Sequence, residues 1–258
     1  MAKAIVPKPI ETVRVAGYET AAATRTEIAE WMAERCLYGR NVNEIPAMLF
    51  SSNGQGIALQ GSNEDYDAAM AAADIVHADG MPVVLCSRLL TSKPIPERSS
   101  TTDLFHDVAK VAEQDALRFF ILGSNEDQNS RVVNVMRSLY PKLQIVGRHH
   151  GYFPDDEDDR ICDLIRESGT DILWVALGKP RQEIWSHRNR EKLAGVGCIK
   201  TCGGLYSYLV GDAPRAPHWM QSLGLEWLFR LMLEPRRLFV RYLTTNIISA
   251  WRLLRYTG

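Results

Sequence analysis

The chain has 258 residues, a formal net charge of −1, and hydrophobic and charged fractions of 46% and 24%. These values are typical of a globular protein that buries a proper core, and the near-zero charge argues against wholesale nucleic-acid binding. The five cysteines are scattered without a Cys-x-x-Cys pair, which indicates neither a disulfide framework nor a zinc site.

Residues 1–40 are expected to form an arm followed by one helix. Residues 1–23 are rich in Ala, Pro and Val without clear periodicity, and we expect an extended or mobile arm. Thr24 and Glu27 have the spacing of a capping box that begins a helix, and Gly39 is a typical residue at which that helix ends.

Residues 41–211 alternate between strand-like and helix-like segments. The expected strands are 45–50, 75–77, 118–122, 144–147, 171–177 and 198–202. The expected helices are 62–73, 81–90, 103–114, 125–139, 155–168 and 181–193. Strands that alternate with helices of this length predict an α/β core, in which a parallel sheet carries helices on both faces. Ligands bind beyond the carboxyl ends of the strands in such sheets, so we expect a site there.

A short repeat, Gly-Ser-Asn-Glu-Asp, occurs at residues 61–65 and again at 123–127. Each copy leads into an expected helix, and we interpret both as N-cap devices. The alternative for the second copy, which directly follows a strand, is a phosphate site at the helix N-terminus.

Residues 212–258 are expected to form a basic, helical appendage. From Arg215 onward there are seven arginines, no lysine and only two glutamates. Two helices are expected, at 222–233 and 235–255, and in the second the arginines gather on one side and apolar residues on the other. Such an amphipathic helix either lies on an anionic bilayer or packs its apolar face on the sheet domain.

Asp79 is the strongest candidate for chemistry. It follows the strand-like run 75–77 and precedes Gly80, so its carboxylate is expected at the mouth of a cleft. There it can accept the proton of a substrate hydroxyl. The alternative is that Asp79 caps the following helix.

Several polar residues are candidates for substrate contacts. Asn53 follows the first expected strand of the core and Gln182 begins a helix, and the amide of either can bind sugar or uracil. Arg98 and the C-terminal arginines can bind a diphosphate, because a guanidinium matches phosphate oxygens in a bidentate fork. The alternative for each is a turn residue or a solvated surface residue.

Two acidic strings with the spacing of metal-binding motifs are interpreted as structural. Asp-x-Asp strings occur at 65–67 and within 155–159, but both lie at helix starts, where acidic residues complement the helix dipole. We therefore expect no metal site. The chain lacks the P-loop, zinc-protease and serine-hydrolase motifs, and the absence of Gly-x-Gly-x-x-Gly weakens a dinucleotide-binding reading.

Taken together, these motifs resemble the WecG/TagA/CpsF family of bacterial glycosyltransferases, glycosyltransferase family 26. The resemblance covers residues 43–245 and rests on short matches in the right order. They include Ser51-Ser52-Asn53, Ala78-Asp79-Gly80, Pro96-Glu97-Arg98, Thr102-Asp103-Leu104, Leu177 to Glu183, Gly203-Gly204, Arg215-Ala216-Pro217, Gly224 to Trp227 and Glu234-Pro235. Thr101, in place of a usual Gly, and Ser207, in place of a frequent Asp, depart from the pattern.

The resemblance implies a Rossmann-like fold and an inverting, metal-independent transfer of a hexosyl-type sugar from a UDP-sugar. The implied acceptor is a saccharide on polyprenyl diphosphate, in cell-surface polysaccharide biosynthesis. Carried over by position, Asp79 matches the general base and Arg98 an active-site arginine. The other implied substrate-binding residues are Ser51, Asn53 and Gln182, with Arg215, Arg230 and Arg237 serving the diphosphate.

The expected partners are a UDP-sugar, the lipid-linked acceptor and the inner membrane surface, with homo-oligomer formation left open and no cofactor beyond the donor. No apolar run approaches the ~18 residues of a membrane span and no signal peptide is recognised, so we expect a cytoplasmic, peripheral protein. N-acetylmannosamine, its uronic acid, glucose and glucuronic acid remain open as the transferred sugar. The alternatives are a nucleotide-sugar-modifying Rossmann enzyme and a non-catalytic, membrane-docked component of a polysaccharide assembly complex.

Overall fold

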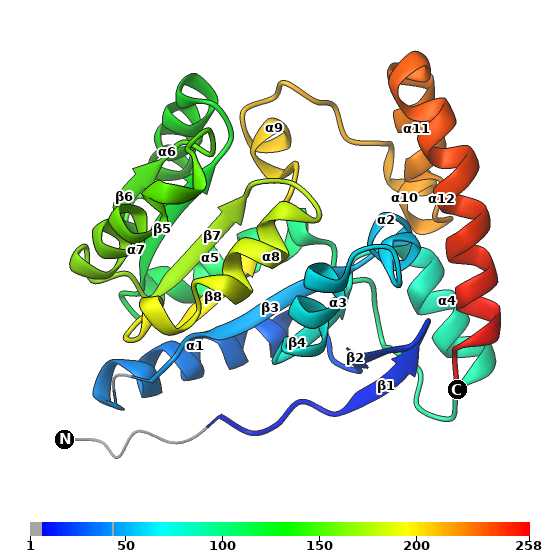
Figure 1. Cartoon of the computed structure of the whole chain (residues 1–258), viewed down its shortest axis with the longest axis horizontal. Coiled ribbons are helices and arrows are strands. Elements are labelled where there is room, and N and C mark those ends of the chain that lie inside the picture. The colour runs from blue at the N-terminus through cyan, green and yellow to red at the C-terminus, as the bar shows by residue number, and fades with distance from the viewer. Residues whose placement is uncertain (1–6, 43) are drawn as a thin grey trace.

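An eight-stranded, mostly parallel sheet forms the centre of the structure, a computed structural model that describes residues 7–42 and 44–258 (Figure 1). The strand order is β1-β2-β4-β3-β8-β7-β5-β6, in which β1 and β2 pair antiparallel and the other pairings are parallel. The strands are β1 (Thr12–Val15), β2 (Tyr18–Ala21), β3 (Ala47–Ser52), β4 (Ile75–Ala78), β5 (Arg118–Gly123), β6 (Gln144–His149), β7 (Ile172–Ala176) and β8 (Cys198–Thr201). The predicted α/β class with a parallel sheet is confirmed.

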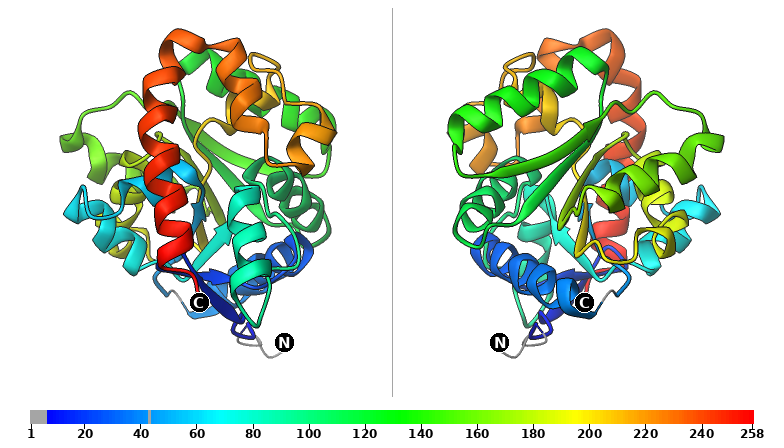
Figure 2. Two further views of the ribbon diagram at one scale, coloured as in Figure 1. Left: turned by 90° about the vertical axis from the view of Figure 1, so that its right-hand side faces the viewer. Right: turned by 90° about the vertical axis from the view of Figure 1, so that its left-hand side faces the viewer.

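Helices cover both faces of the sheet (Figure 2). One face packs against α1 (Arg25–Val42), α5 (Thr101–Gln114), α6 (Glu126–Leu139) and α9 (Leu205–Leu209). The other packs against α3 (Glu64–Ala71), α7 (Asp158–Glu167) and α8 (Arg181–Arg188). The buried residues of α5 recur every three or four positions, as a helix with one apolar face requires. Phe105 of α5 packs edge-on against Trp174 of β7, with ring centroids 4.4 Å apart.

Residues 12–21, expected to belong to an extended or mobile arm, form a hairpin at the edge of the sheet. β2 pairs with β4 through Thr20 and Val76, and the turn at Ala16 and Gly17 uses positive φ angles of 51° and 86°. The expectation was wrong for these residues because each strand has only four of them, too few for a clear alternating pattern. Residues 1–6 of the expected arm lie outside the described residues.

Two of the five remaining α-helices, α2 (Gly54–Leu59) and α4 (Met81–Leu90), follow β3 and β4. The others form the C-terminal segment, which we define as residues 212–258: α10 (His218–Ser222), α11 (Glu226–Leu233) and α12 (Pro235–Arg255). Two short 3₁₀ turns are also present: η1 (Asp155–Glu157) leads into α7, and η2 (Glu191–Leu193) lies between α8 and β8. Within the described ranges no helix is long and apolar enough to cross a membrane.

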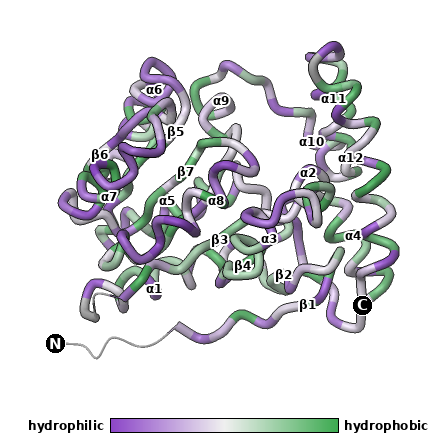
Figure 3. Tube along the Cα trace, in the orientation of Figure 1, coloured by the Kyte–Doolittle hydropathy of each residue, from purple (hydrophilic) through white to green (hydrophobic). Residues whose placement is uncertain are grey.

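Helix α12 lies along α2 and α4 (Figure 1), and the side it turns toward them is only partly apolar. Leu253 is buried there, but so is Ser249, and Arg252 donates to the Gln60 carbonyl at 2.6 Å. Hydrophobic residues recur along α11 and α12 (Figure 3), and many of them face outward. Most of the predicted apolar face of α12 is exposed, so the alternative in which this face packs on the sheet domain is wrong for most of its residues.

Candidate active site

A cavity of about 700 Å³ lies at the carboxyl ends of β3, β4 and β8, where the fold class predicts a ligand site. Its floor is formed by the loops that leave these strands, and α11 and α12 of the C-terminal segment close it from above. Ser51, Asn53, Asp79, Arg98, Gln182 and Arg230 all line it, so the structure brings together six of the residues selected from the sequence.

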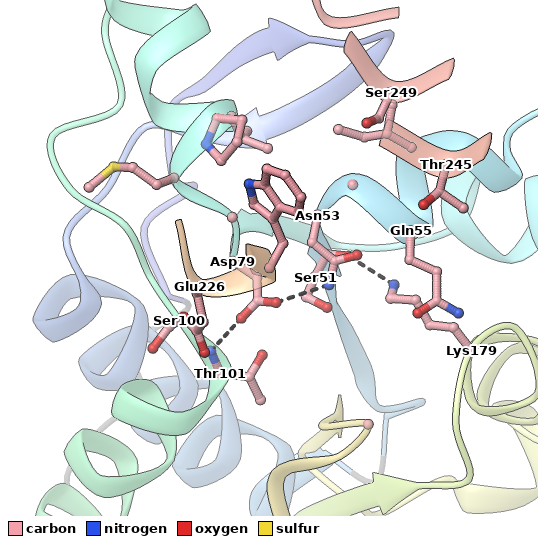
Figure 4. A pocket seen from close by; sticks show the side chains of 18 of the residues that line it. Ser51, Asn53, Gln55, Asp79, Ser100, Thr101, Lys179, Glu226, Thr245 and Ser249 are labelled. Carbon is pink, nitrogen blue, oxygen red and sulfur yellow. Dashed lines mark hydrogen bonds between the residues drawn. The ribbon is translucent and has the colours of Figure 1, made fainter. Parts of the chain in front are cut away.

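The sheet register places Asn53 and Asp79 beside each other. Ser52 of β3 pairs with Ala78 of β4, so the next residue of each strand leaves the sheet at the same point. The Asn53 side-chain amide donates to Asp79 Oδ2 at 3.0 Å, as Figure 4 shows. Asn53 also caps α2 by accepting the Gly56 N–H at 3.1 Å, so the amide is held at both ends.

The Asp79 carboxylate receives a second hydrogen bond from the first turn of α5. The Thr101 N–H donates to Oδ1 at 2.7 Å, and this donor is free because the first N–H groups of a helix have no partner within it. Burial raises the pKa of Asp79, but its interactions with His77, Asn53 and Thr101 outweigh that effect and hold the pKa below its usual value. Asp79 is therefore an ionised carboxylate at neutral pH, with part of its surface accessible from the cavity.

The capping alternative for Asp79 is not realised. Gly80 is the N-cap residue of α4, and no side chain caps that helix. Asn63 and Asn125 do cap α3 and α6, as the repeated pentapeptide predicted, by accepting the N–H groups of Tyr66 and Gln128.

Gln182 lines the cavity, but other protein groups occupy both of its amide atoms. Oε1 accepts the Gly203 N–H at 2.9 Å, and Nε2 donates to Glu183 Oε1 at 2.8 Å. The side chain is 1% exposed, which makes it part of the floor of the cavity. Its contacts hold the Gly203 turn after β8 against the start of α8.

Lys179, which the sequence reasoning missed, brings a cation to the same part of the cavity. Its Nζ lies 2.9 Å from Glu183 Oε1 and 2.9 Å from the carbonyl of Ser51. The Ser51 side chain is itself buried at the cavity wall. In the sequence, Lys179 is distinguished only by its place between Gly178 and Pro180, in the same motif that contains Gln182.

Two further titratable groups lie beneath the cavity and were also missed. Burial lowers the pKa of His77 to about 3, and its Nδ1 donates to the Ser99 carbonyl at 2.8 Å. Burial also lowers the pKa of Lys200, on β8, to about 8. Both residues could have been predicted to be buried, because His77 and Lys200 each lie within an expected apolar strand, where titratable side chains are uncommon.

The arginines divide into two groups. Arg98 lines the cavity and is paired with Glu226 of α11 at 3.0 Å. Arg230 and Arg241 also line it, with their guanidinium groups 5.8 Å and 5.2 Å from the ring centres of Tyr208 and Tyr242. Arg241 was not among the site residues selected from the sequence.

Arg215 does not join this cavity as expected. Arg215 is absent from the cavity wall and forms a bidentate pair with Asp103, with a shortest distance of 2.6 Å. The side chain of Arg237 lies outside the described residues. The local sequence places both on the C-terminal segment but does not indicate which way either side chain points.

The two acidic strings lie away from the cavity wall. Asp67 accepts the Gly61 N–H at 2.8 Å, and Asp158 accepts from the Trp185 indole at 2.8 Å and is paired with Arg188 at 2.7 Å. Among the described residues no three His, Cys, Asp or Glu side chains gather in a way that could hold a metal ion.

Comparison with known proteins gives consistent matches. Residues 13–257 match the model of the "Glycosyl transferase WecG/TagA/CpsF family". An N-acetylglucosaminyldiphosphoundecaprenol N-acetyl-beta-D-mannosaminyltransferase of Bacillus subtilis (strain 168) is 33% identical over 197 residues, which are 75% of this chain and 74% of the relative. The protein of the same name from Bacillus spizizenii is 31% identical over 175 residues, 68% of this chain and 66% of the relative.

Proposed function

Because the chain belongs to the WecG/TagA/CpsF family of glycosyl transferases, we propose that it moves a hexosyl-type sugar from a UDP-sugar to a saccharide carried on polyprenyl diphosphate. The names of the two relatives support this acceptor class, since both act on a sugar linked through diphosphate to undecaprenol. They also make N-acetylmannosamine the first sugar to test. The proposed role is in cell-surface polysaccharide biosynthesis.

The observation that carries the proposal is the Asp79 carboxylate, hydrogen-bonded by the Thr101 N–H, at the floor of a cavity whose upper wall holds arginines. In the proposed reaction Asp79 accepts the proton of the acceptor hydroxyl while that oxygen attacks C1 of the donor sugar. The bond from C1 to the diphosphate oxygen breaks on the opposite side, which inverts the anomeric centre. UDP leaves with the bonding electrons, and Asp79 is left protonated.

Arg230 and Arg241 are proposed to stabilise the departing diphosphate. Both line the upper wall of the cavity, and no carboxylate is paired with either within the described residues, whereas Arg98 already faces Glu226. Cations held in place before the reaction stabilise developing phosphate charge without reorganisation. Their stacking on Tyr208 and Tyr242 supports such preorganisation.

The C-terminal segment is proposed to bring the cavity to the inner face of the cytoplasmic membrane. The outward side of α12 exposes Phe239, Leu243, Ile247 and Leu254, each by more than half of its surface. A continuous exposed apolar strip of this kind is unusual for a protein surface in water and suits the interfacial region of a bilayer. A lipid-linked acceptor would meet the enzyme at that surface.

Transfer assays with Asp79→Asn test the proposal. We expect wild-type protein to release UDP from UDP-N-acetylmannosamine only when a short polyprenyl-diphosphate-linked N-acetylglucosamine is present. We expect Asp79→Asn to lower kcat by about 10²–10⁴-fold with little change in donor binding, because the amide cannot accept the proton. Near-native turnover by Asp79→Asn would contradict the role of this residue.

Further arms of the same assay separate the alternatives. A panel of UDP-sugars with and without EDTA identifies the donor and tests whether the reaction needs a divalent metal. Bound NAD in the purified protein would instead favour a nucleotide-sugar-modifying enzyme. Vesicle binding without transfer to any acceptor would favour a non-catalytic component of an assembly complex.

A further inference from the structure

A short segment, residues 98–103, connects the C-terminal segment to the carboxylate of Asp79. It begins at Arg98 and runs into the first turn of α5, where the Thr101 N–H donates to Asp79. Just before Thr101, the Ser99 N–H donates to the Ala78 carbonyl at 2.9 Å, so this stretch lies directly on the end of β4. A shift of the segment would therefore move one of the two hydrogen-bond donors to the Asp79 carboxylate.

Ion pairs bind the C-terminal segment to both ends of the 98–103 segment. At the first end, Arg98 Nη1 donates to Glu226 Oε2 of α11 at 3.0 Å. At the other end, the Arg215 guanidinium donates to both carboxylate oxygens of Asp103, at 2.6 Å and 3.3 Å. Thr101 lies between the two ion pairs.

Further contacts join the two ion pairs. Arg215 Nη2 also donates to Gln221 Oε1 at 2.9 Å, and Arg98 Nη2 reaches the same oxygen at 3.5 Å. Asp103 is tied to the start of α5 because the Ser100 hydroxyl donates to its carboxylate at 2.6 Å. Arg215 thus has protein partners for its guanidinium, which leaves it poorly placed to bind a diphosphate.

We propose that these two ion pairs clamp the 98–103 segment and thereby fix the Thr101 amide against the Asp79 carboxylate. Arg215 and Asp103 are then positioning residues that act through Thr101, and docking of the C-terminal segment is coupled to the orientation of Asp79. The catalytic part of this inference rests on the proposed function, whereas the structural part does not.

Four variants test the clamp: Arg215→Met, Asp103→Asn, their combination, and the conservative Arg215→Lys. Each of the first two is expected to lower kcat by about 10- to 100-fold with less than about a threefold change in the KM of the donor, because a misaligned base slows the reaction without weakening binding. The combined variant is expected to lie within about threefold of Asp103→Asn, since that change already removes the contact with Arg215, together with an Arg25 contact at 3.3 Å. Arg215→Lys is expected to recover part of the loss.

The matched control is another ion pair that also ties the C-terminal segment to the core. Arg131 of α6 is paired with Asp212 at 2.8 Å and touches neither the 98–103 segment nor the cavity wall. Arg131→Met and Asp212→Asn are expected to leave kcat within about twofold of the wild-type value.

Two results would overturn the clamp. A rise of tenfold or more in the donor KM at unchanged kcat would make Arg215 a substrate ligand, and losses that multiply in the combined variant would show two independent roles. Amide hydrogen exchange gives a readout that needs no activity. Exchange at Thr101 is expected to accelerate by about tenfold or more in Arg215→Met and Asp103→Asn while core strands stay protected.

The exchange experiment also separates this inference from the proposed function. If the wild-type protein transfers no sugar but Thr101 exchange responds as expected, the proposed function fails and the clamp stands. If transfer is observed and Thr101 stays equally protected in both variants, the clamp fails and the proposed function stands.

Discussion

Lys200 is an uncommon residue for the middle of a sheet, because its side chain has no solvent exposure. Its ammonium group donates to the Thr201 carbonyl at 2.5 Å. Burial disfavours the charged form, and the nearby carboxylates of Asp79 and Glu183 offset this only in part, so the pKa falls from 10.5 to about 8. At neutral pH the protein therefore keeps a buried positive charge below the cavity, at a cost in stability.

Replacing Lys200 by Met is expected to stabilise the fold at pH 7. The folded-state pKa lies below the unfolded value, so the burial penalty is complete below pH 8 and disappears as the pH rises toward 10.5. A shift of this size corresponds to a gain on the order of 3 kcal/mol in the free energy of unfolding at pH 7. Urea unfolding of both proteins at pH 7 and pH 10 measures the gain and its decline.

The surface residue Lys110 supplies the control for this comparison. Its side chain is 63% exposed, and Lys110→Met is expected to change the free energy of unfolding by less than about 0.5 kcal/mol at either pH. A Lys200→Met protein that is less stable than wild type at pH 7 would mean that the charge contributes net stability through its neighbours.

At the scale of elements, α12 has two different faces with separate tasks. Its inner side carries Arg241 at the cavity wall and Arg252 against Gln60. Its outer side is apolar and exposed. The periodicity of the sequence correctly separated the two sides, but the basic side faces the protein more than was expected. The helix thus presents cations inward and an apolar strip outward.

The combined substitution of Phe239, Leu243 and Ile247 by serine is expected to weaken vesicle binding. These residues are four positions apart on the outer side of α12 and are 57–65% exposed. Co-sedimentation with vesicles rich in anionic phospholipid should show at least about a tenfold lower partition coefficient, because apolar burial drives interfacial binding. Circular dichroism and thermal unfolding should stay near wild type.

Leu139→Ser serves as the matched control for the vesicle experiment. Leu139 lies at the end of α6, outside the C-terminal segment, and is 55% exposed. Its substitution should leave vesicle binding unchanged. If the triple serine variant bound vesicles as well as this control does, the outer side of α12 would not be the membrane-facing surface.

At the scale of the whole molecule, the last described residues close onto the first hairpin (Figure 1). The Gly17 N–H donates to the Tyr256 carbonyl at 2.8 Å, and the Ala16 N–H donates to the Thr257 hydroxyl at 3.1 Å. The Gly258 N–H donates to the carbonyl of Arg14 at 3.2 Å. These bonds tie the end of α12 to the β1–β2 edge of the sheet and so hold the helix over the cavity.

Removal of residues 256–258 is expected to lower Tm by roughly 6–12 °C. Three hydrogen bonds contribute on the order of 1 kcal/mol each, and in a domain of this size each kcal/mol corresponds to roughly 2–4 °C. Thr257→Val, which removes one of the three, should lower Tm by about a third as much. An unchanged Tm in the shortened chain would show that α12 is held by its contacts with α2 and α4 alone.

Local patterns in the sequence were sufficient to predict the parallel core, both asparagine caps and the place of Asp79 at a strand end. Each of these depends on neighbouring residues: apolar runs, helical periodicity, or a capping residue beside its helix. The family followed as well, because its short motifs are local. The hairpin at residues 12–21 was missed because its strands are too short to show a period.

The partners of side chains were decided only by the tertiary structure. Arg215 and Asp103 are 112 residues apart in the chain, and no local pattern distinguishes an arginine that meets a carboxylate from one that faces a cavity. For the same reason the sequence did not indicate that the Gln182 side chain accepts a hydrogen bond from the Gly203 N–H, or that Arg241 lines the cavity wall. Periodicity determines the element and the face on which a side chain lies, whereas its partner depends on how distant elements pack.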